Sequence, residues 1–180
     1  MSIRKMRGPR NTQGLYDLLE RLPSNIEMVE VGSYAGESAK IFLSSGKIDC
    51  LYAVDIWSDD LGAYERLQRG HDFKLVEKRF DEETQGFNVK KFKMTLDSAL
   101  PGLPIVDFAY IDANHDYDFV KSDILNCLKI LKPSGIIAGH DYVEQSPGVI
   151  EAVDEIFGKP DRVFSDKSWL VDLKNFYKRS

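Results

Sequence analysis

A short apolar run that passes directly into a glycine-bounded turn constrains the fold of this chain more than any other stretch. The run covers residues 26–31, and Gly32 and Gly36 bound the turn. Apolar runs of this length that stop at glycine are typical of central strands in a parallel sheet, which are buried on both faces. The two glycines permit a tight turn in which the backbone approaches a ligand, and the following helix offers N–H groups there. We therefore predict a strand, a ligand-binding turn and a helix at the centre of an open α/β sheet.

The residues of this turn distinguish between two kinds of cofactor. A dinucleotide site uses the pattern G-x-G-x-x-G, but the second glycine position is Tyr34 here. Glu30 stands two residues before Gly32, where a carboxylate would repel a phosphate and attract an ammonium group. S-adenosylmethionine carries an ammonium group and no phosphate, so it suits the turn better than a nicotinamide dinucleotide. A tight turn that binds no ligand is the remaining alternative.

Strand and helix patterns alternate along the rest of the chain. This order predicts an α/β fold, a Rossmann-like doubly wound sheet that is mostly parallel and ends in a C-terminal antiparallel hairpin. We expect strands over residues 26–31, 51–54, 87–94, 105–111 and 136–139, helices over 12–22, 36–43, 117–131 and 147–157, and a hairpin from 162–165 and 168–175.

Length and composition indicate one globular domain over residues 1–180, of which 43% are hydrophobic and 29% charged. Residues 1–10 form a basic arm that we expect to be flexible. The stretch 56–86 is longer than an ordinary crossover and heavily charged. Two short apolar stripes, Ala63 to Leu67 and Phe73 to Phe80, predict helices in it. It is therefore expected to be a helical insertion or lid, or an ordinary surface insertion.

Charge and cysteine content limit the classes of partner. The net charge of −5 disfavours nucleic acid as a partner, because such a surface needs a basic face. No long apolar segment follows the basic arm, so neither a secretory signal nor a membrane anchor is expected. Cys50 and Cys127 each lie among apolar residues, which predicts core packing without a disulfide and a cytoplasmic protein.

Polar residues stand where the predicted strands end, at the edge where ligands of open α/β sheets bind. Asp55 ends the second strand, where a carboxylate commonly accepts from ribose hydroxyls. The other strand ends carry Glu30, Met94 with Thr95, Asp112, and His140 with Asp141.

His115 follows Asp112 by three residues and brings an imidazole to the same edge. Its ordinary pKa range suits a general base near neutral pH. Asp112, His140 and Asp141 have side chains that hold divalent cations such as Mg²⁺ or Mn²⁺, and such an ion would lower the pKa of an acceptor hydroxyl. Helix capping or loop hydrogen bonding is the alternative role of the two acids, and a structural hydrogen bond is the alternative for His140.

Four segments together resemble class I S-adenosylmethionine-dependent methyltransferases. More narrowly, they are similar to the branch that contains metal-dependent sugar O-methyltransferases and cephalosporin-hydroxylase-like proteins. The similarity spans roughly residues 26–142, and its most specific parts are the patterns I-D-x-x-H-x-Y and G-H-D-Y. The segments are Glu30–Ser38, Val54–Asp55, Tyr110–Tyr117 and Leu131–Tyr142.

The resemblance implies a seven-stranded sheet and a role for each matching residue. Asp112 and Asp141 would be metal ligands, Asp112 would also contact the cofactor, and His115 would be the general base. The chain departs from the sugar enzymes at His140, where they have an acid. The implied cofactor contacts are Glu30, Gly32, Ser33, Tyr34, Gly36 and Ser38 around the methionine part, Asp55 at the ribose and Thr95 near the adenine.

These observations predict a methyltransferase that acts on a small-molecule acceptor, through a hydroxyl oxygen. The acceptor pocket would come from the 56–86 insertion, from the loop after Tyr142, or from the partner subunit of a homo-oligomer. A protein that binds S-adenosylmethionine without catalysis is one alternative. A nicotinamide-dependent oxidoreductase is another, and Tyr34 and Glu30 disfavour it.

Overall fold

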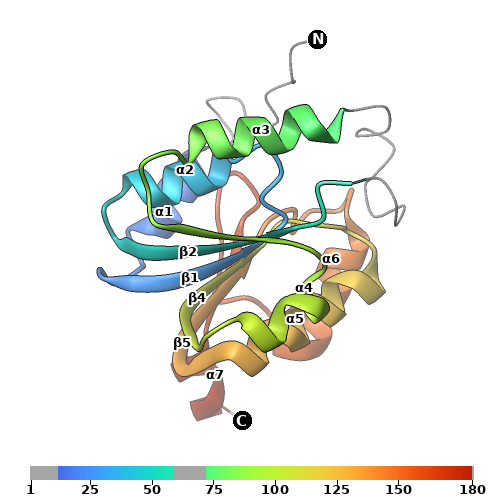
Figure 1. Ribbon diagram of the computed structural model, residues 1–180. Coiled ribbons are helices and arrows are strands. Elements are labelled where there is room, and N and C mark those ends of the chain that lie inside the picture. The colour runs from blue at the N-terminus through green and yellow to red at the C-terminus, as the bar shows by residue number, and fades with distance from the viewer. Residues whose placement is uncertain (1–11, 59–71, 180) are drawn as a thin grey trace.

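The computed structural model describes residues 12–58 and 72–179. Within these ranges, seven strands form one sheet in the order β3-β2-β1-β4-β5-β7-β6 (Figure 1). The predicted fold class is confirmed, including the antiparallel pairing of the last two strands. The elements are α1 (Gln13–Leu19), β1 (Ile26–Val31), α2 (Glu37–Ser44), β2 (Ile48–Asp55), α3 (Phe73–Glu83), β3 (Val89–Lys93), α4 (Leu96–Ala99), the 3₁₀ turn Leu100–Gly102, β4 (Val106–Ile111), α5 (Tyr117–Ile130), β5 (Leu131–Gly139), α6 (Pro147–Phe157), β6 (Arg162–Val163), β7 (Trp169–Asp172) and α7 (Leu173–Arg179).

The centre of the sheet is parallel, and β1 lies between β2 and β4. The chain moves outward on one side of β1 to β2 and β3, then crosses to β4 and β5 on the other side. This reversal makes the carboxyl ends of β1 and β4 a topological switch point, which is where open α/β sheets bind ligands. The expected strand over residues 26–31 begins and ends where β1 does.

Side chains alternate along the strands and build a core on each face of the sheet. Met28 packs into the core under α1, α2 and α3, while Val29 packs into the core under α4, α5, α6 and α7. Figure 1 shows the two groups of helices on opposite sides of the strands. Cys50 and Cys127 are free thiols buried in the second core, as expected from their apolar neighbours.

The structure corrects the end of the chain, where residues 173–175 were expected to continue the last strand. They begin α7 instead, because the Asp172 carboxylate accepts a hydrogen bond from the Lys174 N–H at 2.9 Å. A side-chain acceptor at this place satisfies a helix N–H and ends the strand. The strand expected over 136–139 also starts earlier, since Leu131 already pairs with Val106 of β4.

Of the two helices expected in the 56–86 insertion, the second is α3, which buries Phe73, Val76 and Phe80. The first, at Ala63 to Leu67, and the basic arm 1–10 lie outside the described residues. The lysine-rich strand β3 lies at the edge of the sheet, as its charges predicted. Among the residues described, no helix has both the length and the apolar character that crossing a bilayer requires.

Candidate active site

The carboxyl ends of β2, β1, β4 and β5 lie side by side. Backbone hydrogen bonds join them: Gly32 N–H donates to Val54 O at 2.9 Å and Asp112 N–H donates to Val31 O at 2.8 Å. One strand further along the sheet, His140 N–H donates to the carbonyl at the end of β4 at 3.0 Å. The structure therefore assembles the strand-end residues that the sequence placed at one edge.

The turn over residues 32–36, here called the glycine turn, requires glycine at its first position for two reasons. Gly32 has φ +88°, in the left-handed region that side chains disfavour. A Cβ atom added there would also lie 2.2 Å from the backbone oxygen of Asp112. The turn after β1 and the loop after β4 are thus in direct backbone contact at the switch point.

Several backbone N–H groups of the glycine turn are already bonded within the protein. Tyr34 has φ +42° although it is not glycine, and its N–H donates to Asp55 Oδ2 at 2.8 Å. Gly36 N–H donates to Ser33 O at 2.8 Å, and Gly32 N–H is bonded to β2 as described above. Three N–H groups of the turn are therefore bonded to protein acceptors and are not free to bind a phosphate.

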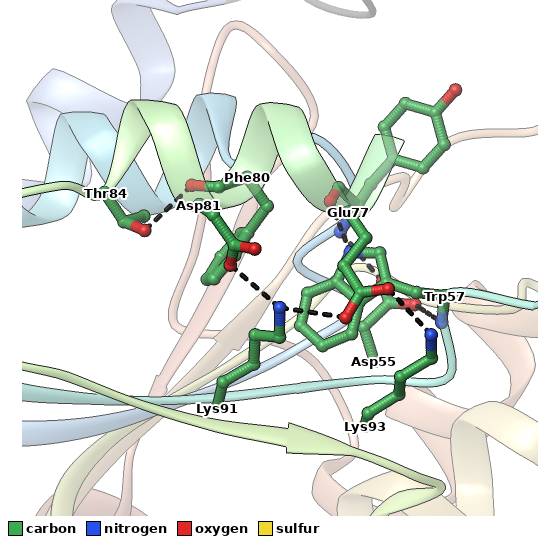
Figure 2. A network of polar contacts seen from close by, with 9 residues as sticks. Asp55, Trp57, Glu77, Phe80, Asp81, Thr84, Lys91 and Lys93 are labelled. Carbon is green, nitrogen blue, oxygen red and sulfur yellow. Dashed lines mark hydrogen bonds and ion pairs between the residues drawn. The ribbon is translucent and has the colours of Figure 1, made fainter. Parts of the chain in front are cut away.

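Trp57, which was not among the predicted site residues, also holds the Asp55 carboxylate in place. Its backbone N–H donates to Asp55 Oδ1 and its indole Nε1–H donates to Tyr34 O, both at 2.8 Å. The side chain is 2% exposed, and Figure 2 shows it beside Asp55 below α3. The sequence signal was an aromatic residue two positions after the acid at the end of β2. Its role depends on φ +40° at Trp57, which no residue pattern indicates.

A pocket opens along this edge from the glycine turn toward α4 and α5. Five predicted cofactor residues line it: Gly32, Tyr34, Asp55, Thr95 and Asp112. Four others, Glu30, Ser33, Gly36 and Ser38, are buried and do not line it. The remaining lining residues are Val31, Val54, Ile56, Met94, Leu96, Ala113, Asn114, Phe119 and Asp123.

Two buried polar residues flank Val31 and Gly32, which line the pocket. Glu30 is fully buried and Ser33 is 2% exposed. The Ser33 hydroxyl has no hydrogen-bond partner among the described residues, which is uncommon for a buried polar group. Both lie in the stretch that was predicted to surround the methionine part of the cofactor, so this part of the structure fits a ligand with polar groups.

Asp123 is a pocket residue that the sequence analysis missed. It lies on α5 between the buried residues Val120, Ile124 and Cys127, and it lines the pocket near Phe119. Burial raises the pKa of its carboxyl to about 7. In the sequence, the feature that could have indicated this residue is the position of an acid within the apolar face of a predicted helix.

Three side chains from the loops after β4 and β5 form a charged corner: Asp112, His115 and Asp141. Their ligand atoms lie within 4.8 Å of one another. His115 Nε2 lies 3.1 Å from Asp141 Oδ2 and 3.9 Å from Asp112 Oδ1. His140, predicted as a metal ligand, instead places Nδ1 2.9 Å from Asp141 Oδ2 and lies outside this group. The donor set of the corner fits a divalent cation, with His115 in the place that was expected for His140.

The carboxylates of the corner strongly affect the protonation of His115. Burial lowers the pKa of His115, but hydrogen bonds with Asp112 and Asp141 outweigh it and raise the pKa to about 10. For Asp141, burial raises the pKa of the carboxyl. Its hydrogen bonds with His115 and His140 outweigh burial and hold the pKa well below the usual range. In the absence of an ion, the corner at neutral pH thus contains an imidazolium held by carboxylates.

Left-handed backbone recurs at this edge of the sheet. Tyr34, Trp57 and Asp141 all have positive φ without being glycine. Such conformations cost about 1–2 kcal/mol each and are found preferentially at functional sites. Positive φ also occurs at Asn25, before β1, and at Lys167, so it accompanies the glycine turn and the charged corner without being confined to them.

Comparison with known proteins agrees with this location. A family model described as a methyltransferase domain matches residues 29–142, more than half of the chain. A search of curated proteins returned no match.

Similar solved structures include precorrin 8W decarboxylase from Methanobacterium thermoautotrophicum, with 17% identity over 92% of this chain and 87% of that chain and a TM-score of 0.60. The O-methyltransferase TomG from Streptomyces achromogenes, in complex with SAM, is 12% identical over 93% of this chain and 81% of its own, with a TM-score of 0.58. CalS11, a TDP-rhamnose 3'-O-methyltransferase of calicheamicin biosynthesis, is 15% identical over 91% and 77%, with a TM-score of 0.55. At these identities, the likeness establishes the fold.

Proposed function

The chain belongs to the methyltransferase domain family, and from this premise we propose that it transfers the methyl group of S-adenosylmethionine to a hydroxyl oxygen of a small-molecule acceptor. TomG, which has the same fold, was solved with SAM bound, and CalS11 is named for O-methylation of a sugar nucleotide. These names support the choice of cofactor and of acceptor class. The proposed catalytic roles rest on the residues of the charged corner of this chain.

One observation carries the choice of cofactor: the glycine turn has little left to offer a diphosphate. Tyr34 N–H is bonded to Asp55, and Tyr34 lines the pocket at the position where a dinucleotide pattern has glycine. Glu30, two residues before Gly32 in the chain, is a fully buried acid. A ligand with an ammonium group and no phosphate matches this arrangement, because it does not need those N–H groups and gains from the acid.

The cofactor would then extend along the pocket. Its methionine part would lie at the glycine turn over Glu30 and Ser33. Its ribose would bond to Asp55, and its adenine would lie near Thr95. The sulfonium would face the loop after β4, which carries the charged corner. This direction is supported by the pocket lining, which runs from the turn to α4.

In the reaction, a lone pair of the acceptor oxygen attacks the methyl carbon while the C–S bond breaks and its electrons remain on sulfur. The products are S-adenosylhomocysteine and the methyl ether, and the hydroxyl proton passes to His115 Nε2. Alignment of the two reactants supplies about 7–11 kcal/mol of the barrier reduction, and the base about 10²–10⁴-fold in rate. His115 accepts this proton only after it has released its own to solvent.

A divalent cation would be held by Asp112, His115 and Asp141, or by the two acids alone with His115 as base. When bound, such an ion lowers the pKa of an acceptor hydroxyl that it touches. The residues of the corner hold the acceptor beside the methyl donor in either case.

Calorimetric titration with S-adenosylhomocysteine and with NAD tests the choice of cofactor. We expect binding of the first and none of the second. Binding of NAD alone would overturn the proposal, because the glycine turn would then accept a diphosphate.

Turnover of the His115→Ala variant tests the charged corner. We expect at least a tenfold loss of turnover with unchanged affinity for S-adenosylhomocysteine, since the side chain would act on the acceptor proton alone. Asp118→Asn is the control, because Asp118 is exposed on α5 and lies outside the charged corner and the pocket, so its turnover should be unchanged. Mass analysis of candidate sugars and other hydroxyl compounds for an added methyl group gives the turnover. Unchanged turnover in His115→Ala would remove His115 from the mechanism.

The same assay in the presence of a chelator distinguishes a corner that holds a divalent cation from one in which His115 acts as base without an ion. Loss of activity that Mg²⁺ or Mn²⁺ restores would indicate an ion at Asp112 and Asp141. Full activity in chelator would exclude the ion and leave His115 as base. A protein that binds S-adenosylhomocysteine but methylates none of the candidates would favour a binding role.

A further inference from the structure

Ion pairs connect α3 to the edge strand β3 (Figure 2). Lys91 Nζ lies 2.8 Å from Asp81 Oδ1 and 2.9 Å from Glu77 Oε1. Lys93 Nζ lies 2.7 Å from Glu77 Oε2. Exposed pairs of this kind contribute little to stability, so their position is of more interest than their number.

The Lys91 ammonium also lies over aromatic rings at the border of the site. Its Nζ is 5.0 Å from the centre of the Trp57 ring and 5.9 Å from that of Phe80. The two rings pack on each other with their centres 5.0 Å apart. The Lys91 side chain is 27% exposed, so this cation–π contact is partly shielded from water and gains strength from it.

Trp57 connects these charges to the proposed ribose site. Its backbone N–H and its indole N–H bond to Asp55 and to Tyr34, and Tyr34 N–H bonds to the other oxygen of Asp55. The orientation of the Asp55 carboxylate thus depends on the place of Trp57. Trp57 lies between that carboxylate and Lys91.

Helix α3 reaches the glycine turn by a second contact. A Cβ atom added to Gly36 would lie 3.2 Å from the Cα atom of Phe80, so the helix backbone packs directly on the turn. The face of α3 that contacts Lys91 is therefore the face that borders the site. By contrast, the neighbouring Lys90 lies over Tyr52, a residue of the core on the other side of the sheet.

We propose that Lys91 is a positioning residue for the cofactor site. Held by Glu77 and Asp81, its ammonium fixes Trp57 beneath α3 and thereby orients Asp55 toward the ribose. The identity of the ligand rests on the proposed function, while the positioning of Trp57 and Asp55 by Lys91 does not depend on it.

The test compares Lys91→Met with Lys90→Met. Both changes remove one ammonium from the same edge strand and keep a long apolar side chain, but only the first removes the contact with Trp57. Lys91→Arg keeps a cation that pairs with carboxylates and stacks on aromatic rings, so it should behave like the wild type. Glu77→Gln weakens the hold on Lys91 without changing Lys91 itself, and it carries the test if Lys91→Met does not fold.

Two measurements read the result. In Lys91→Met, we expect the dissociation constant for S-adenosylhomocysteine to rise about five- to tenfold, with no change in Lys90→Met. We also expect faster amide hydrogen exchange at Tyr34 and Trp57 in the ligand-free protein, with unchanged exchange at Asp112, whose N–H bonds to β1. Glu77→Gln should show the same pattern with a smaller amplitude.

Equal behaviour of Lys91→Met and Lys90→Met in both measurements would overturn the positioning role. Faster exchange at Asp112 by the same factor would overturn it too, because the effect would then be a general loss of stability. Absence of S-adenosylhomocysteine binding in the wild type would contradict the proposed function, and the exchange rates at Tyr34 and Trp57 would still decide the role of Lys91.

Discussion

The glycine turn and the charged corner adjoin each other at the switch point, yet they are built from different groups. The turn is mainly backbone, with Gly32 pressed against the Asp112 main chain and with the N–H groups of Gly32, Tyr34 and Gly36 bonded to two carbonyl oxygens and the Asp55 carboxylate. The corner consists of side chains, and the charges of His115 and Asp141 depend on each other. One region is fixed by shape and the other by ionisation.

This difference indicates how the two halves of the proposed reaction are controlled. A site made of backbone holds one ligand geometry at every pH, which suits a cofactor that is always the same. A site made of titrating side chains responds to protons and ions, which suits the activation of an acceptor hydroxyl. Changes of shape should therefore damage the first region most, and changes of pH the second.

Gly32→Ala should have the largest effect. The added methyl group meets the Asp112 carbonyl at 2.2 Å in a left-handed backbone, so we expect a loss of about 3 kcal/mol of unfolding free energy and at least tenfold weaker binding of S-adenosylhomocysteine. Urea unfolding and calorimetry give the two values. Gly46→Ala is the control, because Gly46 has φ +71° with no atom within 4 Å of an added Cβ, so it should lose only about 1–2 kcal/mol. Equal losses in the two variants would show that the contact with Asp112 does not shape the turn.

The stability of the protein should fall as pH rises between about 6.5 and 10, and His115 should cause the decline. The pKa of His115 is raised from its ordinary 6.5 to about 10 in the folded state, so its stabilising contribution is complete below 6.5 and disappears as pH approaches 10. We expect wild type to lose at least about 1.4 kcal/mol more than His115→Gln over this range, measured by urea unfolding in chelator. Parallel curves for the two proteins would contradict the ion pairs of the charged corner. In the absence of an ion, turnover should also rise with pH over the same range, since only the neutral imidazole accepts a proton.

Asp123→Asn tests a residue outside both regions, because Asp123 is a titrating acid on α5 that lines the same pocket as the glycine turn. Its folded pKa of about 7 lies above the ordinary 3.8, so wild-type stability falls as pH rises from 3.8 to 7 and the charged form is the less favourable one. We expect Asp123→Asn to be more stable than wild type by about 1 kcal/mol at pH 8, with a smaller difference at pH 4. Thermal unfolding at both values measures this. Asp118→Asn is the control, because it removes a carboxylate at an exposed position of the same helix that does not line the pocket. A variant that is less stable at pH 8 would mean that the Asp123 carboxylate has a stabilising partner.

The sequence predicted the fold well because the central strands are specified locally. Apolar runs that end at an acid or a glycine located β1, β2 and β4, and their order required a parallel sheet with its polar ends at one edge. The end of the chain was predicted less well. One side-chain cap at Asp172 changed a strand into α7, and no apolar period signals such a hydrogen bond.

The site was predictable in part for a related reason. The positions at strand ends, such as Asp55 and Asp112, follow from topology alone. The roles of Trp57 and Asp123 do not follow from topology. The role of Trp57 depends on a left-handed backbone, and that of Asp123 depends on the packing of α5 against the pocket. His115 was expected at this edge as a base, but its place in the group of ligand atoms with Asp112 and Asp141 was not, since His140 had been predicted there.

The contact of Gly32 with the Asp112 main chain has a consequence for the evolution of acceptor choice. It joins the proposed donor side of the site to the main chain of the loop that carries Asp112 and His115, so the spacing between these two stretches of backbone does not depend on any rotamer. Loops further out, such as residues 143–146, do not contribute to this span. We therefore expect that exchanging those loops with a relative would change which molecule is methylated while the transfer distance stays constant.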